Sequence, residues 1–297
     1  MDIFDRLKQA AASDWNSYVE HDFVRQMGAG TLAQPAFRKY LVQDYLFLIQ
    51  FARSWALAAY KSRTLADIRA AQAGLAAILD ETELHVRLCQ RWGLSPDDLA
   101  ATPEHQATVA YTRFVLDCGA AGDLLDLHVA LAPCVIGYAE IGRNLTPDGI
   151  EALGDHPYRD WIGEYAGAGY QGVATAARAH LDDLASRAMT ERRFEELAKL
   201  FGQASRLEAD FWQMGLDAIG EPRYPWATSQ ARSVDCCATG RLLSSASSCC
   251  PACRPCTSGA SSTPCTCQIP NGWSGPTTTS ASSISPSRMT GRRSTRS

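Results

Sequence analysis

A cysteine and a tyrosine lie four residues apart inside the apolar stretch LAPCVIGYAEIG, residues 131–142. On a helix this spacing puts the thiol of Cys134 and the phenol of Tyr138 on one face. A deprotonated thiol is a strong nucleophile, although a buried cysteine more often serves as a small apolar side chain. Pro133 directly precedes Cys134, and a proline inside a helix removes one hydrogen bond and kinks the chain. The stretch therefore predicts the wall of a pocket with a candidate nucleophile.

Two carboxylates lie on otherwise apolar helical faces. Asp44 is embedded in LVQDYLFLIQF and shares a face with Phe47, and Glu208 in SRLEADFWQMG is followed by aromatic residues three and four positions later. A buried acid is either paired, for example with a helix arginine, or binds a ligand. Burial also raises the pKa of a carboxyl into the range that suits a general acid or base. Tyr111 begins a further aromatic pair, which could equally belong to an ordinary core.

Glu81 and His85 offer a competing interpretation, because a carboxylate and an imidazole four residues apart on a helix can bind a metal. A di-iron site in a helical bundle needs further Glu and His ligands from other helices. Of the six histidines, only His85 and His128 lie in strongly helical apolar stretches, and no second ligand pair is evident. We therefore expect no metal ligands and keep a metal-dependent oxidase as an alternative.

Helices must position these side chains, because apolar residues recur at helical spacing through nearly all of residues 3–219. No segment shows sustained strand alternation. Thr64 is a suitable N-cap and Gly93 a suitable stop for one of the helices. The sequence predicts an all-α multi-helix domain, about seven helices with short connections. The expected helical segments are 4–19, 34–62, 64–93, 95–120 in two pieces, the strongly apolar and therefore central 122–145, 156–187 and 190–220.

Composition divides the chain near residue 224. Residues 1–224 carry 21 Lys and Arg against 31 Asp and Glu, whereas residues 225–297 carry seven Arg and one Asp. An acidic body argues against a nucleic-acid partner, which normally meets a basic face. The chain has no uninterrupted run of 18 apolar residues and no signal-peptide pattern at its start. We expect a cytoplasmic protein with no membrane partner.

The segment 225–297 differs from residues 1–224 in its amino-acid composition. It lacks Lys and Glu, 27 of its 73 residues are Ser or Thr, and it holds eight of the eleven cysteines. Such a composition cannot bury enough apolar surface to fold alone. We interpret it as a low-complexity, disordered tail or the product of a frameshift. The spacing Cys250, Cys253, Cys256 is a weak zinc-like pattern.

Taken together, these motifs resemble the TenA/thiaminase II family. The resemblance rests on five separated pieces and covers residues 1–220: Asp44 with Phe47, Tyr111, PCVIGYAEIG around Cys134, YRDWIGEY at 158–165, and LEADFWQMG around Glu208. It implies a heme-oxygenase-like helical fold without heme, a homotetramer, and no cofactor. It also implies hydrolysis of 4-amino-5-aminomethyl-2-methylpyrimidine to the hydroxymethylpyrimidine for thiamin salvage, and the ability to split thiamin.

The resemblance also implies a role for each matching residue. Cys134 corresponds to the catalytic cysteine, Glu208 to the acid/base glutamate, and Asp44 to the carboxylate that holds the aminopyrimidine edge. The aromatic lining corresponds to Phe47, Tyr111, Tyr138 and Tyr165. At Phe47 some members carry a tyrosine, so one hydrogen bond to the substrate is missing here. A non-enzymatic pyrimidine-binding regulator that keeps the pocket remains a second alternative.

Overall fold

The computed structural model describes residues 1–219, apart from the side chain of Leu84. The expected boundary near residue 224 and the segment 225–297 lie outside the described residues. Within residues 1–219 the backbone forms eleven α-helices and one short 3-10 helix, with no strand. These are α1 (Ile3–Ala10), α2 (Ala12–Val19), α3 (Asp22–Gly28), α4 (Gln34–Lys61), α5 (Leu65–Arg91), α6 (Pro96–Ala101), α7 (Gln106–Ala121), α8 (Leu124–Asn144), η1 (Ile150–Leu153), α9 (Arg159–Ala166), α10 (Ala168–Ala188) and α11 (Glu191–Asp217).

The all-α prediction is confirmed, and the long helices begin and end close to the expected positions. α5 starts after Thr64, whose side chain accepts a hydrogen bond from the backbone N–H of Asp67. It ends before Gly93, which has a positive φ of 74°, a conformation that glycine adopts without steric cost. The helix count was too low for three reasons. The first segment breaks at Ala11, the segment 156–187 breaks at Gly167, and the short α3 was missed.

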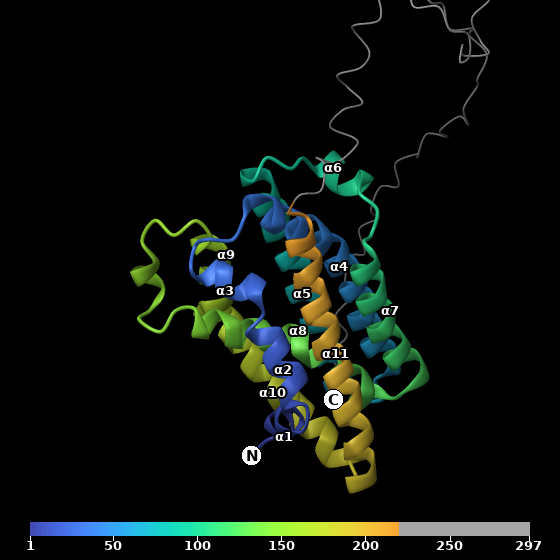
Figure 1. The fold of residues 1–297 in the computed structure, drawn as a ribbon. Helices are drawn as coiled ribbons and strands as arrows, with labels where there is room; N and C mark the ends of the chain where they lie inside the picture. The colour runs from blue at the N-terminus through green and yellow to red at the C-terminus, as the bar shows by residue number, and fades with distance from the viewer. Residues whose placement is uncertain (220–297) are drawn as a thin grey trace, which may run out of the picture. The chain divides into compact units, whose positions relative to one another are not determined.

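α8 is the central helix, as its apolar sequence predicts. Fifteen of its 21 residues are buried, and α2, α4, α7, α9, α10 and α11 pack against it (Figure 1). Its N-terminus is capped reciprocally, because Asp123 accepts from the backbone N–H of Asp126 while Asp126 accepts from that of Asp123. By length and hydropathy α8 could cross a membrane, but 78% of its most apolar window is buried inside the protein. That burial is typical of a core helix.

Two glycines bring neighbouring elements unusually close to α8. Gly137 faces Tyr18 of α2, and a Cβ there would lie 2.5 Å from the tyrosine ring. The Tyr18 hydroxyl donates a hydrogen bond of 3.3 Å to the carbonyl of Pro133. Gly142 faces the backbone between Tyr165 and Ala166 at the end of α9, where a Cβ would lie 2.6 Å from main-chain atoms. This second approach sets the position of Tyr165 relative to α8.

We expect Gly142→Ala to lower the free energy of unfolding by about 1–3 kcal/mol, because backbone atoms cannot rotate away from an added methyl group. Chemical denaturation measures this change. Gly172→Ala is the matched control, since Gly172 lies exposed on α10 and a methyl group added there would meet no atom within 4 Å. It should raise stability by up to about 1 kcal/mol. Equal stability of Gly142→Ala and wild type would contradict the close approach.

Candidate functional site

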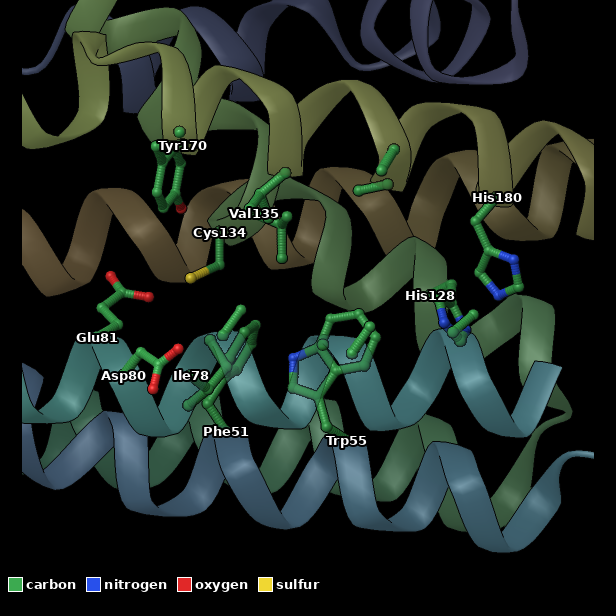
Figure 2. A pocket seen from close by; sticks show the side chains of 18 of the residues that line it. Phe51, Trp55, Ile78, Asp80, Glu81, His128, Cys134, Val135, Tyr170 and His180 are labelled. Carbon is green, nitrogen blue, oxygen red and sulfur yellow. The ribbon is translucent and has the colours of Figure 1, made fainter. Parts of the chain in front are cut away.

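Cys134 lines a cavity of about 620 Å³ between α4, α5, α8 and α10. Figure 2 shows its Sγ directed into this space, with Glu81 of α5 on one side and Tyr170 of α10 on the other. Pro133 lies inside α8, which remains helical from Leu124 to Asn144. The lining is mostly apolar, with Phe51, Ile78 and Val135 close to the thiol end. A flat organic ring fits such surroundings.

Glu208 of α11 and Tyr111 of α7 form a buried pair. The tyrosine hydroxyl donates a hydrogen bond of 2.9 Å to Oε1 of Glu208, and Glu208 is only 1% exposed. Burial raises the pKa of the Glu208 carboxyl to about 8, since the Tyr111 hydrogen bond, which lowers it, does not offset the lost hydration. At neutral pH this group therefore exchanges a proton readily.

Asp44 of α4 has an ionic partner, but it is a histidine rather than the arginine considered from the sequence. Oδ2 of Asp44 lies 2.5 Å from Nε2 of His85 and accepts a 2.8 Å hydrogen bond from the Tyr40 hydroxyl. The Trp161 indole in turn donates to the Tyr40 oxygen at 3.1 Å. Burial alone would lower the pKa of His85, but the Asp44 carboxylate outweighs it and raises the pKa to about 9. His85 is therefore an imidazolium at neutral pH.

This pairing bears on the metal interpretation of Glu81 and His85. Nδ1 of His85 lies 3.1 Å from the Glu81 carbonyl oxygen and Nε2 faces Asp44, so both ring nitrogens are engaged. The Glu81 carboxylate instead accepts a 2.9 Å hydrogen bond from the Tyr165 hydroxyl. Burial raises the pKa of Glu81 to about 7 despite the nearby imidazolium. The pair is thus part of a hydrogen-bonded network, and it does not present two free ligands.

A second group of residues that could bind a metal ion lies at the far end of the cavity. Asp67, His180 and Asp183 place ligand atoms within 4.8 Å of one another. Arg187 already binds both carboxylates, at 2.7 Å from Asp67 Oδ1 and 2.7 Å from Asp183 Oδ2. The guanidinium supplies the positive charge that a cation would bring.

Aromatic side chains surround the buried acids. Phe47 stacks on Phe51, with ring centroids 5.1 Å apart, and lies equally far from Tyr111. Tyr138 lies 4.9 Å from Tyr165 and 5.4 Å from the ring of Trp212. All seven predicted site residues therefore belong to one contiguous region, reached from α4, α7, α8, α9 and α11.

Only one of those seven residues, Cys134, lines the cavity itself. The others form the buried cluster that adjoins the thiol end: Phe47 stacks on the lining residue Phe51, and Tyr165 bonds the lining residue Glu81. The Cys134 thiol belongs to both regions. Burial and then the charges of Glu208, Glu81 and Asp44 raise its pKa well above the ordinary value. The resting side chain is a neutral thiol that needs a base.

Sequence reasoning missed four members of the site: Tyr40, Trp161, Tyr170 and the role of His85 as the partner of Asp44. Tyr40 could have been found, because it precedes Asp44 by one helical turn. The other three come from α5, α9 and α10, and no spacing in the sequence links them to Asp44 or Cys134. Their contacts exist only in the packed bundle.

Comparison with known proteins agrees with this geometry. The model of the TENA/THI-4/PQQC family matches residues 8–218. An aminopyrimidine aminohydrolase from Halalkalibacterium halodurans is 35% identical over 210 residues, which cover 70% of this chain and 92% of that protein. An aminopyrimidine aminohydrolase from Helicobacter pylori is 30% identical, covering 72% of this chain and 98% of that one.

Solved structures give the same result. A TenA family transcription regulator from Silicibacter sp. TM1040 superposes with a TM-score of 0.68 at 44% identity, covering 72% of this chain and 96% of that one. A TenA homologue from Pyrococcus horikoshii OT3 superposes with a TM-score of 0.66 at 25% identity, covering 73% and 100%. The resemblance to TenA proteins is therefore confirmed in both sequence and fold.

The raised pKa of Glu208 predicts a pH-dependent stability. Its folded pKa of about 8 exceeds the ordinary value of 4.5, so the folded protein keeps a proton that the unfolded chain releases. The stability gained from that proton is present below about pH 4.5 and is lost as the pH rises through about 8. We expect Glu208→Gln to become progressively more stable relative to wild type between about pH 5 and 8.

Urea denaturation at several pH values measures this difference. Glu195→Gln, an exposed position on the same helix, is the control and should run parallel to wild type. A Glu208→Gln difference that does not change with pH would contradict the raised pKa.

Proposed function

Because the chain belongs to the TENA/THI-4/PQQC family, we propose that it is an aminopyrimidine aminohydrolase of thiamin salvage. It converts 4-amino-5-aminomethyl-2-methylpyrimidine to 4-amino-5-hydroxymethyl-2-methylpyrimidine and ammonia, and it also cleaves thiamin. The observation that carries the proposal is the Cys134 thiol at the end of an apolar cavity, acted on by Glu208, Glu81 and Asp44. Relatives named aminopyrimidine aminohydrolase, at 30% and 35% identity, support the choice of substrate.

Substrate recognition rests on Asp44. Both of its contacts, with Tyr40 and His85, use Oδ2, so Oδ1 is the oxygen available to a bound ring. The edge formed by the ring nitrogen and the 4-amino group presents hydrogen-bond donors to a carboxylate when the ring is protonated. The imidazolium of His85 fixes the orientation of the Asp44 side chain. Phe47, Tyr138 and Tyr165 pack behind the lining at the thiol end and complete the aromatic surroundings of the bound ring.

Catalysis begins with the thiol. The ionised form of Glu208 takes the proton of Cys134 and passes a proton to a ring nitrogen as Sγ adds to the ring carbon beside C5. The new C–S bond interrupts aromaticity, and the ring electron pair then expels the protonated amino group of the methylene as ammonia. Water adds to the resulting exocyclic methylene, the C–S bond breaks, and the aromatic ring is restored. One difficult displacement thus becomes two easier steps.

The carboxyl pKa values suit these proton transfers. Glu208, with a pKa of about 8, and Glu81, with a pKa of about 7, both change protonation near neutral pH, which is where a general acid or base is most effective. The Tyr111 hydroxyl orients the Glu208 carboxyl through its 2.9 Å hydrogen bond. The proposed sequence of steps uses only side chains and water, without a metal or organic cofactor. We further propose a cytoplasmic homotetramer, as expected for the family.

A pyrimidine-binding regulator without catalysis is the second candidate, because the 44%-identical structure bears the name of a transcription regulator. Release of ammonia from the aminomethylpyrimidine by purified protein distinguishes the two. Turnover supports the hydrolase, and tight binding without any turnover supports the regulator.

We expect Cys134→Ser to reduce turnover to below a few per cent of wild type, roughly a hundredfold loss, because a hydroxyl is a far weaker nucleophile at neutral pH. Substrate affinity should be nearly unchanged. Cys118→Ser is the control, since Cys118 is half-buried on α7 and does not line the cavity. Substantial hydrolysis by Cys134→Ser would refute covalent catalysis.

We expect substitutions of Glu208 and Asp44 to change different kinetic constants. Glu208→Gln should lower kcat by about 10²–10⁴-fold with KM little changed, and the pH profile of kcat should lose one limb. Asp44→Asn should raise KM strongly, because an acceptor becomes a donor facing the substrate's donors. It also removes the partner of the His85 imidazolium, which costs about 3–5 kcal/mol of stability, so folding is verified by circular dichroism. A Glu208→Gln variant with an intact pH profile and a changed KM would refute the acid/base role.

A further inference from the structure

The cavity is longer than the proposed reaction requires. It extends from Cys134, Glu81 and Tyr170 at one end to His128 and His180 at the other, with Trp55 between them (Figure 2). Cys134 and His128 are six residues apart on α8, which corresponds to about 9 Å along a helix axis. An aminopyrimidine ring at the thiol, with ammonia as its leaving group, does not reach the histidines.

Three polar atoms at this far part of the cavity have no hydrogen-bond partner among residues 1–219. They are Nε1 of Trp55, Nε2 of His128 and Nε2 of His180. Trp55 and His128 are each only 7% exposed. Buried polar groups are nearly always hydrogen-bonded, and an unpaired one costs about 1–3 kcal/mol. Because three such atoms line one cavity, we infer that a molecule bound in the cavity supplies their hydrogen-bond partners.

The chemistry of these atoms is complementary to a hydroxyl group. Nδ1 of His128 lies 2.8 Å from the Leu124 carbonyl oxygen, so Nδ1 carries the proton and Nε2 is an acceptor. The Trp55 indole can only donate. Burial lowers the pKa of His128 to about 4 and also lowers that of His180, so both rings are neutral. The Trp55 donor, the His128 acceptor and the unpaired His180 Nε2 lie on uncharged rings, and such a site matches an alcohol better than a carboxylate or an ammonium.

The rings are also held in place. The centroids of Trp55 and His128 are 5.6 Å apart and those of His128 and His180 are 4.8 Å apart, each pair edge to face. Gly74 of α5 lets the Trp55 ring lie so close that a Cβ would come within 2.4 Å of it. Arg187 binds the nearby carboxylates Asp67 and Asp183 and offsets one of their two negative charges. The unpaired atoms therefore belong to a preformed surface.

We propose that Trp55, His128 and His180 form a subsite for an alcohol at the end of a leaving group larger than ammonia. The proposal rests on the proposed function and specifies a further substrate class, aminopyrimidines whose methylene carries an alcohol-ended group of several atoms. Thiamin, which ends in a hydroxyethyl group on the leaving side, falls within this class. The aminomethylpyrimidine occupies only the thiol end.

Three ligands test the subsite directly. Each is 4-amino-2-methylpyrimidine with a 5-methylene substituent: the primary amine, the 3-hydroxypropylamine, or the butylamine, in which a methyl group replaces the hydroxyl. Calorimetry with Cys134→Ser measures binding without turnover. We expect the alcohol to bind about tenfold more tightly than the butylamine, a typical effect of one or two net hydrogen bonds.

Variants assign that difference to the subsite. Adding His128→Phe, or Trp55→Phe, to Cys134→Ser should bring the alcohol and the butylamine to equal affinity, while the primary amine binds as before. Equal affinities already in Cys134→Ser would overturn the proposal, and this comparison needs no second variant to fold. A preference for the alcohol that survives in both double variants would also overturn it.

Turnover of the primary amine by wild type is measured separately, so that the two proposals fail independently. Hydrolysis without preference for the alcohol refutes the subsite alone. Preference for the alcohol without hydrolysis of any ligand refutes the hydrolase and leaves an alcohol-binding subsite in place.

Discussion

Three carboxyl groups around one thiol, two of them buried and one half-buried, are the constraint on which the rest of this structure depends. Asp44, Glu81 and Glu208 lie on three different helices, and each loses hydration inside the bundle. The protein compensates them unequally. Asp44 receives an imidazolium and a tyrosine hydroxyl, whereas Glu81 and Glu208 each receive a single tyrosine hydroxyl. This inequality leaves Glu81 and Glu208 with raised pKa values, so both titrate near neutral pH.

The need to hydrogen-bond these carboxyl groups without adding charge to the core explains why tyrosines are so numerous here. A phenol donates one hydrogen bond to a buried carboxylate and offers an apolar ring to everything else, so it satisfies the acid without bringing another charge into the core. Tyr40, Tyr111 and Tyr165 each make that bond to a different acid. Burial raises the pKa of all three hydroxyls, so they remain donors. The rings of Tyr111 and Tyr165 also pack at tilted angles against Phe47, Tyr138 and Trp161, beside the thiol end of the cavity.

The central helix α8 joins the two parts of the site. Cys134 faces the acids and His128, about two turns earlier, faces the far end of the cavity. The close approaches at Gly137 and Gly142 hold α8 against α2 and the end of α9. One rigid helix therefore fixes the Cys134 thiol and the His128 imidazole relative to each other at the two ends of the cavity.

The sequence by itself determined the helical class, the length of the long helices and the central place of α8, because periodicity and caps are local properties of the chain. It also singled out six of the seven candidate site residues by their types and spacing, whereas Tyr165 was indicated only by the resemblance to the TenA/thiaminase II family. Tertiary structure alone decided that His85 pairs with Asp44, that Glu81 bonds Tyr165, and that only Cys134 of the seven residues lines the cavity. It also decided which polar atoms are left without partners among residues 1–219. Such pairings join residues that are tens of positions apart on different helices, and no repeat along the chain encodes which of them meet when the bundle packs.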